Sequence, residues 1–367
     1  EQRYQFPTIR PVHVDHIEQK DDYLDVYAGD QYWRAKAVVS ATGTWSQPHI
    51  PNDIGREKFK GIQLHSADYM NAAPFKNKKV IVVGGGNPGA QILAEVAKVA
   101  DLAFLALPHK TSMAFAKDLL DLGVKVVDLS ADYRLELETY EKHYCEHIDK
   151  EHIKDAVYGL PEYFRDEIKN AKLIANPGCY PTASLLALLP FIDYIDTDAP
   201  IFIDAKSGVS GAGKNPSETT HYCQINDNVH AYNPFKHRHM PEIAEKVKIL
   251  KGKDVSINFV PHLLPLTRGM LVSVFATLKD DIDVNEVLNK AYKDCEFIRL
   301  RDKPVDVKSV AGTNFCDLFV AKNGKALFVS SAIDNLLRGA SSQAVVNANI
   351  LCGYEEYEGI PKIAYVP

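Results

Sequence analysis

The chain has 367 residues, of which 46% are hydrophobic and 25% are charged, and its formal net charge is −6. This composition is typical of a globular protein, and the length suits two or three domains that each bury a core. The acidic balance offers no basic surface for nucleic acid, and no apolar run approaches the ~20 residues that span a bilayer. We therefore expect small-molecule partners, with no membrane or nucleic-acid partner.

Six cysteines are scattered along the chain without any C-x-x-C pair. This spacing indicates neither a disulfide framework nor a zinc site, so free thiols and no metal ion are expected. The charged stretch that begins at Glu1 has no signal-peptide pattern. Together these features favour the reducing environment of the cytoplasm.

The first hundred residues are predicted to contain a β-hairpin followed by a strand–loop–helix unit. Tyr23–Tyr27 and Gln31–Val39 alternate apolar and polar residues around a turn at Ala28–Asp30. Further along, the apolar strand Lys79–Val83 leads into a glycine-rich loop, and a helix is expected over residues 90–99.

From residue 101 the pattern alternates between β and α elements, which favours a parallel sheet covered by helices and a second sheet after it. The predicted strands are Leu102–Leu107, Val124–Asp128, Leu173–Ala175, Ile201–Asp204, Val255–Val260 and Met270–Thr277. The predicted helices are Thr111–Leu122, Pro177–Leu189, Val284–Asp294 and Ser341–Leu351. We expect the last helix to pack back on the first domain.

The glycine-rich loop matches G-x-G-x-x-G at Gly84, Gly86 and Gly89, between a strand and a helix. Glycine in these positions lets backbone N–H groups approach a pyrophosphate at the helix N-terminus. A dinucleotide-binding unit should then present an acidic residue about 20 positions later, but Pro108 and His109 stand there instead. The loop is therefore either a cofactor site or a tight turn that binds nothing.

Cys179 lies in the sharpest motif, Asn176-Pro177-Gly178-Cys179-Tyr180-Pro181-Thr182, at the predicted start of a helix. The positive end of a helix dipole favours a thiolate, and a thiolate can attack an acyl carbon. The alternative is a buried structural cysteine.

Two later segments offer partners for such a nucleophile. The segment from His237 to Ile243 supplies imidazoles for proton transfer near neutral pH, although it could also be a solvated basic turn or, through its H-x-H pattern, contribute to a metal site. The small-residue loop from Ser207 to Lys214 could admit an anionic ligand against its backbone, or it could be a flexible surface connection.

Several motifs together resemble the N-acetyl-γ-glutamyl-phosphate reductase family, in that family's order, over residues 101–367. The residues that carry the resemblance are Leu107–His109, Asp128–Arg134, Tyr158–Glu162, Asn176–Thr182, Ser207–Lys214, His237–Ile243, Pro261–Leu263, Thr267–Met270, Gly312–Asn314 and Asp334–Ala340.

The resemblance implies an α/β fold like that of aspartate-semialdehyde dehydrogenase, in which a split Rossmann-like NADP-binding domain is interrupted by a catalytic domain that also mediates oligomerisation. It implies NADPH-dependent reduction of an acyl phosphate in arginine biosynthesis, by a homo-oligomer that is a dimer or a tetramer. Cys179 would be the nucleophile and His239 the acid–base residue, with His237 the alternative. The implied substrate-binding residues are Arg134, Lys214, His237, Arg238 and Arg268. The implied cofactor-binding residues are Gly84, Gly86, Gly89, Pro108, His109, Ser207, Gly208 and Asn335.

Residues 1–100 instead resemble an internal stretch of a flavin-containing monooxygenase-like oxidoreductase. The resemblance rests on Ala41–Pro51 and on Lys79–Gln91, and the two resemblances meet near Lys98–Asp101. The flavin-binding loop of such proteins does not occur before these segments, so FAD is not expected.

The two resemblances divide the chain into a flavin-monooxygenase-like, β-rich extension (1–78), a hybrid Rossmann-like region (79–176, completed by 335–367) and a catalytic and dimerisation domain (177–334). The roughly sixty residues that should precede Leu107 in the reductase family are missing. We therefore expect an incomplete cofactor-binding sheet that holds the adenosine half of NADPH poorly. Two alternatives remain: a flavin monooxygenase-like oxidoreductase, and a catalytically impaired fusion product.

Overall fold

The computed structural model describes residues 14–36, 38, 61–76, 92, 96, 100–213, 215–360 and 362–364. The chain divides into two compact units, Glu1–Met70 and Asn71–Pro367, each of which is described by itself. Among the described residues, no helix combines the length and the apolar character needed to cross a membrane.

The described part of the first unit is a three-stranded antiparallel sheet in which β2 is central. Its strands are β1 (His16–Gln19), β2 (Leu24–Ala28) and β3 (Gln31–Ala35). Gly29 adopts a φ of +56° in the turn between β2 and β3, a conformation that glycine reaches without strain. The predicted hairpin is confirmed, although β3 ends before Val39, and β1 was not predicted.

The second unit begins with a four-stranded parallel sheet of order β4-β5-β7-β6. Its strands are β4 (Leu102–Leu105), β5 (Lys125–Asp128), β6 (Val157–Tyr158) and β7 (Leu173–Ala175), and the helices that connect them are α2 (Ser112–Asp121), α3 (Leu137–His143) and α4 (Pro161–Asn170). Alternate residues of β5 face opposite sides: Val126 packs in the core that contains α2, and Val127 packs in the core that contains α9 (Ser342–Leu351). The sheet is thus covered on both faces, as the alternating pattern predicted.

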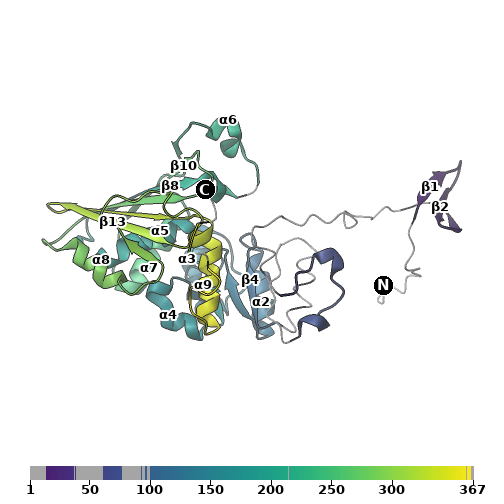
Figure 1. Ribbon diagram of the computed structural model, residues 1–367, viewed down its shortest axis with the longest axis horizontal. Coiled ribbons are helices and arrows are strands. Elements are labelled where there is room, and N and C mark those ends of the chain that lie inside the picture. Colours follow the sequence, from purple (N-terminus) through teal and green to yellow (C-terminus); the bar gives the residue numbers. More distant parts are fainter. Residues whose placement is uncertain are drawn as a thin grey trace. The chain divides into compact units, whose positions relative to one another are not determined.

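The C-terminal helix α9 confirms the prediction that the chain returns to its first sheet, because its buried Val346 and Ile350 share a core with Ile168 of α4. Figure 1 shows α9 beside the smaller sheet. The predicted strand at Lys79–Val83 and the glycine loop lie outside the described residues. Of the helix predicted over 90–99, only residues 92 and 96 are described, and both are helical.

The larger sheet has seven strands in the order β12-β13-β14-β11-β8-β10-β9. Its strands are β8 (Ile201–Gly208), β9 (His230–Ala231), β10 (Ile257–Leu264), β11 (Met270–Thr277), β12 (Ile298–Leu300), β13 (Cys316–Asn323) and β14 (Ala326–Ile333). Helices α5 (Cys179–Leu188), α7 (His239–Lys251) and α8 (Val284–Tyr292) lie on one side of it (Figure 1) and fill its main core.

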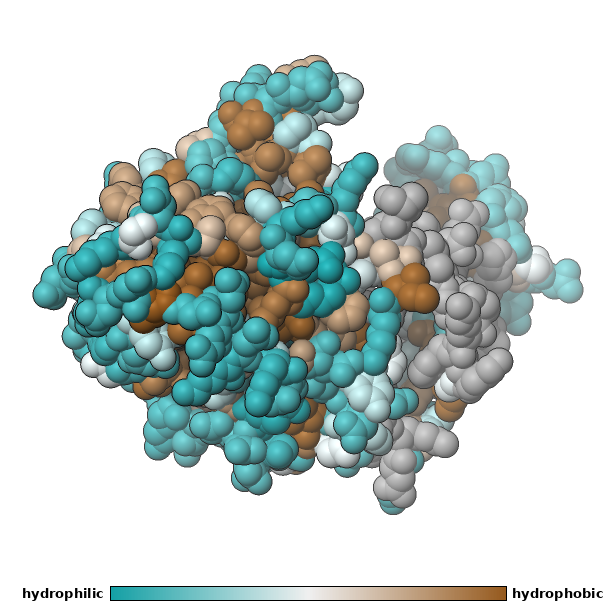
Figure 2. Space-filling view, turned by 60° about the vertical axis from the view of Figure 1, so that its left-hand side comes forward, coloured by the Kyte–Doolittle hydropathy of each residue, from teal (hydrophilic) through white to brown (hydrophobic). Residues whose placement is uncertain are grey.

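The other face of this sheet has no helix over it among the described residues. Phe202 of β8 and Phe275 of β11 are paired across the strands there and are 50% and 45% exposed. The ring of Phe275 also lies 5.2 Å from that of Phe328 on β14. The segment that carries α6 (Tyr222–Ile225) projects from the body, and apolar residues gather where it joins (Figure 2).

Three predictions for this region need correction. The strands β8 and β10 run further than predicted, to Gly208 and Leu264, because their last residues complete a parallel ladder with each other. The β13–β14 hairpin around Gly324, which has a φ of +55°, was not predicted. The segment after Arg238, for which a solvated basic turn was one alternative, forms the helix α7, whose buried residues include Ile243 and Val247.

Candidate active site

The predicted nucleophile, Cys179, is the first residue of α5 and follows a short turn from the end of β7. Thr182 closes this turn, since its backbone N–H and its hydroxyl both donate to the carbonyl of Gly178, at 3.0 and 2.9 Å. Every residue of α5 after Cys179 is buried, whereas Cys179 is half-buried. The helix is therefore a fixed support that presents one thiol at its exposed end.

The side chain of Asn176 ties the same turn to the C-terminal part of the chain. Its Nδ2 donates to the carbonyl of Ala340 at 3.1 Å, and its Oδ1 accepts from Asn347 Nδ2 at 3.0 Å. Gly339 packs directly against the nucleophile, so a Cβ atom added there would lie 2.6 Å from the Cβ of Cys179. Only a residue without a side chain fits behind the thiol.

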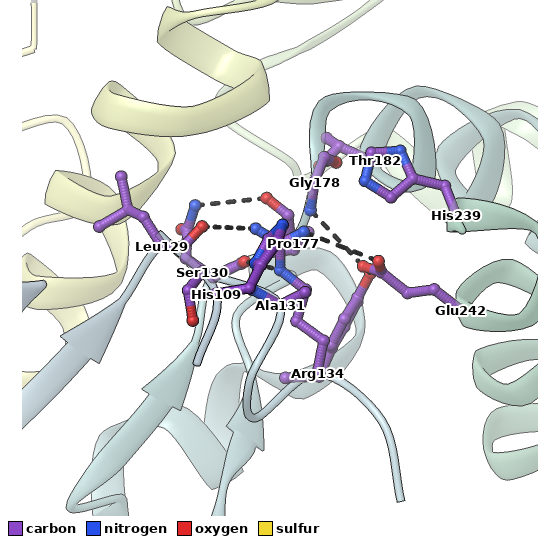
Figure 3. A network of polar contacts seen from close by, with 12 residues as sticks. His109, Leu129, Ser130, Ala131, Arg134, Pro177, Gly178, Thr182, His239 and Glu242 are labelled. Carbon is purple, nitrogen blue, oxygen red and sulfur yellow. Dashed lines mark hydrogen bonds and ion pairs between the residues drawn. The ribbon is translucent and has the colours of Figure 1, made fainter. Parts of the chain in front are cut away.

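His239, the first residue of α7, lies next to the cysteine turn (Figure 3). A Cβ atom added to Gly178 would lie 2.7 Å from His239 Nε2. His237 supports this arrangement, because its Nδ1 accepts from the backbone N–H of His239 at 3.2 Å. The ring of Tyr180 packs edge-on against both imidazoles, with centroid separations of 5.5 Å to His237 and 5.9 Å to His239. The structure thus brings together two motifs that are 60 residues apart in the sequence.

A buried arginine and a buried glutamate lie beneath the turn (Figure 3). Arg134 donates from Nε to the carbonyl of Asn176 at 2.7 Å and from Nη2 to that of Leu129 at 2.6 Å. Its Nη1 lies 3.7 Å from Oε2 of Glu242. Glu242 Oε1 accepts from the hydroxyl of Tyr158 at 2.7 Å and faces the backbone N–H of Gly178 at 3.5 Å. Two of the five N–H donors of Arg134 are therefore committed to main-chain carbonyls, and its Nη1 is paired with Glu242.

His109 and Arg238 complete this cluster on its more open side. His109 Nδ1 accepts from the backbone N–H of Ala131 at 3.1 Å, and its ring packs edge-on against Tyr144 at 5.5 Å. The guanidinium of the exposed Arg238 lies over the same tyrosine ring, 5.1 Å from its centroid. Pro108 is exposed at the entry to α2, where its carbonyl accepts from the N–H groups of Thr111 and Ser112.

The resting protonation state of the site differs from the sequence prediction. Burial raises the pKa of the Cys179 thiol to about 11, which outweighs the backbone N–H groups at the helix start and the positive charge of Arg134. Burial, together with the nearby His237 and Arg134, holds the pKa of His239 well below its usual value. The prediction of an ionised Cys179 is therefore wrong for the unliganded protein, because loss of solvation outweighs the helix dipole.

A second cluster of predicted residues lies around the loop after β8. Gly208 approaches the backbone so closely that an added Cβ would lie 2.7 Å from the carbonyl of Leu266, and one at Gly211 would lie 2.8 Å from Ser207 Oγ. Asn335 holds this loop in place, since its Nδ2 donates to Ser210 Oγ at 3.0 Å and its Oδ1 accepts from the N–H of Gly269 at 2.8 Å.

The second cluster adjoins the first through Asp334, whose carbonyl accepts from the N–H of Gly339 at 2.9 Å. Arg268 lies 3.9 Å from the Asp334 carboxylate and contacts the loop cluster rather than the cysteine turn. The remaining predicted site residues, Gly84, Gly86, Gly89 and Lys214, lie outside the described residues. Among the residues that the structure describes, no group of three or more His, Cys, Asp or Glu side chains is arranged to hold a metal ion.

Three residues of the site had no predicted role, although they lie in motifs named above: Glu242, Tyr158 and Gly339. A signal was available for Glu242, because it stands three residues after His239, and such spacing places two side chains on the same face of a helix. Nothing in the sequence linked Tyr158 or Gly339 to the site, since both come from segments far from Cys179 along the chain.

Comparison with known families agrees with this geometry. The family model described as the semialdehyde dehydrogenase dimerisation domain matches residues 179–335, and the model described as the corresponding NAD-binding domain matches residues 79–171. A third model, described as flavin-binding monooxygenase-like, matches residues 30–115 and overlaps the second. The predicted resemblance of the N-terminal part is confirmed, and it extends past the seam expected near Lys98–Asp101.

The chain is 68% identical over 272 residues to the N-acetyl-γ-glutamyl-phosphate reductase of Sulfurovum sp. (strain NBC37-1), a match that covers 74% of this chain and 81% of that protein. The chain belongs to the N-acetyl-γ-glutamyl-phosphate reductase family. The member from Wolinella succinogenes is 60% identical over 273 residues, with the same two coverages, 74% and 81%.

Solved structures show that this family member shares the semialdehyde dehydrogenase fold. Aspartate semialdehyde dehydrogenase II from Vibrio cholerae superposes with a TM-score of 0.56 at 21% identity, over 70% of this chain and 81% of that one. The Candida albicans enzyme with NADP superposes with a TM-score of 0.52 at 12% identity, over 69% and 78% of the two chains. The predicted α/β fold with an NAD(P)-binding and a dimerisation domain is confirmed.

Proposed function

We propose that the protein reduces N-acetyl-γ-glutamyl phosphate to the corresponding semialdehyde and phosphate, with Cys179 as the nucleophile and NADPH as the reductant. The observation that carries the proposal is that His239, at the start of α7, lies next to Gly178, the residue immediately before Cys179 at the start of α5. Reduction of an acyl phosphate through a covalent intermediate needs such a thiol with a proton acceptor beside it.

In the first half of the proposed reaction, His239 accepts the proton of the Cys179 thiol while the sulfur attacks the acyl carbon. The bond to phosphate breaks, the phosphate that leaves takes up a proton from solvent, and an acyl thioester remains. Both groups are neutral in the resting site, and the thiol has the much higher pKa, so proton transfer is unfavourable before the substrate binds. An anionic acyl phosphate beside His239 would stabilise the imidazolium and make this transfer easier.

In the second half, hydride is added to the thioester carbon, and the resulting thiohemiacetal anion expels the sulfur to give the semialdehyde. The thiolate that leaves takes back the proton from His239, which restores the neutral pair. Arg134 stabilises negative charge at the turn through its field, while its Nε and Nη2 hold the main-chain carbonyls of Asn176 and Leu129. Arg238 and His109, on the open side, are the groups free to meet the substrate's anionic ends.

The loop around Ser207 and Gly208 is the proposed nicotinamide side of the cofactor site. Gly208 and Gly211 let this loop pack closely against Leu266 and Ser207, where a Cβ atom would not fit, and this packing fixes the path of its main chain. Asn335 fixes this loop rather than standing free in it. NADPH, when bound, supplies the hydride. Lys214, Arg268, Pro108 and the loop glycines Gly84, Gly86 and Gly89 remain proposed binding residues.

We propose the same division of the chain as the sequence predicted: a flavin-monooxygenase-like extension (1–78), a hybrid cofactor-binding region (79–176 with 335–367) and a catalytic domain (177–334). Residues 79–99 would supply a strand and helix next to β4, which ends the described order of the smaller sheet. The adenosine half of NADPH would then have few partners. Titration with NADPH should show weak binding, and micromolar affinity would refute an incomplete site.

The uncovered face of the seven-stranded sheet is the proposed site of homodimerisation. It carries the exposed pair Phe202 and Phe275 and belongs to the segment that matches a dimerisation-domain model. Exposed aromatic side chains on a broad sheet are typical of surfaces that are covered in an assembly.

Phosphate-dependent reduction of NADP⁺ by N-acetylglutamate semialdehyde, followed by absorbance, tests the activity. The wild-type protein should turn over, and Cys179→Ser should not. Absence of turnover in a folded wild-type protein would favour the alternative of an impaired fusion product.

The flavin-monooxygenase-like match over residues 30–115 favours a second candidate, an NADPH-dependent flavin oxidoreductase. A yellow purified protein with a flavin absorbance band would support it.

A further inference from the structure

Arg338 is a charged side chain buried far from solvent in a short π-helical turn. The turn, η9, spans Leu337–Ser341, and Arg338 has 0% of its surface exposed. Its Nη2 donates to Glu162 Oε1 in the first turn of α4, and no hydrogen-bond partner is found for its Nε and Nη1 among the described residues. A buried guanidinium requires its counter-charge, because leaving it unpaired is strongly destabilising.

The two residues after Arg338 form the wall behind the nucleophile. Gly339 packs against Cys179, with space for no Cβ atom. The carbonyl of Ala340 accepts from Asn176 Nδ2, three residues before the cysteine. A shift of the π-helical turn would therefore also move the turn that carries Cys179.

A π-helical turn holds one residue more than the α-helix would, and such turns are rare and occur mostly as single turns at functional sites. Relaxation of η9 to α-helical geometry would rotate its residues relative to Cys179. Arg338 or Ala340 would then replace Gly339 opposite the thiol, and their Cβ atoms would collide with it. The contact that holds Arg338 against Glu162 of α4 therefore also determines that Gly339 is the residue that faces Cys179.

We infer that Arg338 and Glu162 are positioning residues for Cys179: their buried ion pair sets the register of the π-helical turn and thereby holds Gly339 behind the thiol. This inference rests on the proposed function, since it concerns the same nucleophile. The pair acts through the backbone, because the charges that shift the pKa of Cys179 most are those of Arg134 and Glu242.

The first test is Glu162→Gln, which keeps the shape of the side chain and removes its charge. We expect kcat to fall by about 100-fold with little change in KM, as displacement of a reacting group by about 1 Å can do. Peptide-resolved alkylation should show an altered pH profile at Cys179 and unchanged profiles at Cys145, Cys223 and Cys352. Cys295 and Cys316 do not serve as references, because the charge of Glu162 itself raises the pKa of both thiols. The matched control is Glu356→Gln. It breaks the ion pair between Glu356 and Arg165, which lies on α4 as Glu162 does, without touching the cysteine turn.

The double variant Glu162→Met with Arg338→Met separates positioning from stability. Replacing a buried ion pair by apolar residues of similar size is often neutral or stabilising. We expect a native melting temperature together with a reduced kcat and the altered alkylation profile. Native kcat and native Cys179 alkylation in either folded variant would overturn the inference. Alkylation needs no substrate, so this result is independent of whether the wild-type protein reduces the acyl phosphate.

Discussion

His239 Nε2 lies against the α-carbon of Gly178, the residue immediately before the nucleophile, so closely that an added Cβ would be 2.7 Å away. The same Cβ would be 2.9 Å from Arg134 Nη1. Gly178 has a φ of −72°, which any residue can adopt, so glycine is required for space and not for backbone freedom.

Gly178→Ala should therefore displace His239 and Arg134 without straining the backbone. We expect a stability loss of about 2 kcal/mol from overpacking and a fall in kcat of about 100-fold. Gly252→Ala is the control, because Gly252 has a φ of +63° with open space around it, so the substitution destabilises the C-terminus of α7 away from the site. Comparable losses of activity in both variants would show that stability alone is responsible.

Glu242→Gln should speed alkylation of the Cys179 thiol but slow catalytic turnover. The negative charge of Glu242 raises the pKa of Cys179, so its removal lowers that pKa and speeds alkylation at pH 8. Turnover should nevertheless fall, because Arg134 loses its buried counter-charge and the protein is destabilised by about 3 kcal/mol.

The control for this prediction is Glu245→Gln on the same helix, whose carboxylate instead pairs with Lys246 and accepts from the N–H of Glu136. Its alkylation profile should match that of the wild type. Slower alkylation of Cys179 in Glu242→Gln would contradict the electrostatic argument.

Stability should fall on acidification below pH 6.5 because of the buried histidines. Burial lowers the pKa of His237 from 6.5 to about 4, so the unfolded chain binds a proton in this range and the folded protein does not. The contribution is fully present above pH 6.5 and is lost as the pH falls towards 4, to a total of about 3 kcal/mol.

His237→Gln removes this titration and should flatten the loss of stability between pH 6.5 and 4, as measured by urea unfolding across the range. The amide oxygen can still accept from the backbone N–H of His239, as His237 Nδ1 does now. If the variant loses as much stability as the wild type between pH 6.5 and 4, other groups are responsible for the loss. The nearest with lowered pKa values are His239 and His109.

Phe275→Asp should dissociate the proposed homodimer, because it places a charge in the middle of the uncovered sheet face. Sedimentation velocity should show a shift to the monomer. The control is Leu122→Asp, which also replaces an exposed apolar side chain by a charged one, but at the end of α2. It should leave the assembly intact. A wild-type protein that is already monomeric would remove the basis for this interface.

Much of this arrangement could be predicted because it depends on local signals. Gly123, with a φ of +81°, ends α2 where the pattern placed its end, and the small residues around Cys179 identified the turn between β7 and α5. The sequence offered the segment around His239 as a partner for Cys179 on chemical grounds, and His239 lies beside Gly178, the residue before the cysteine.

The rest depends on contacts that no local pattern encodes. A solvated basic turn remained an alternative for the start of α7 because His237, Arg238 and His239 suggest solvent, whereas the segment is a helix that buries Ile243 and Val247. The ionisation of Cys179 was wrongly predicted for the same reason: the helix dipole can be read from the sequence, whereas the depth of burial that raises the pKa cannot.

A thiol with a pKa near 11 is almost entirely protonated in neutral solution. Peroxide and related oxidants attack thiolates, so the first oxidation product, the sulfenic acid, should form slowly at this residue while the protein waits for its substrate. We therefore expect the same burial that raises the pKa of Cys179 to slow its oxidation between turnovers.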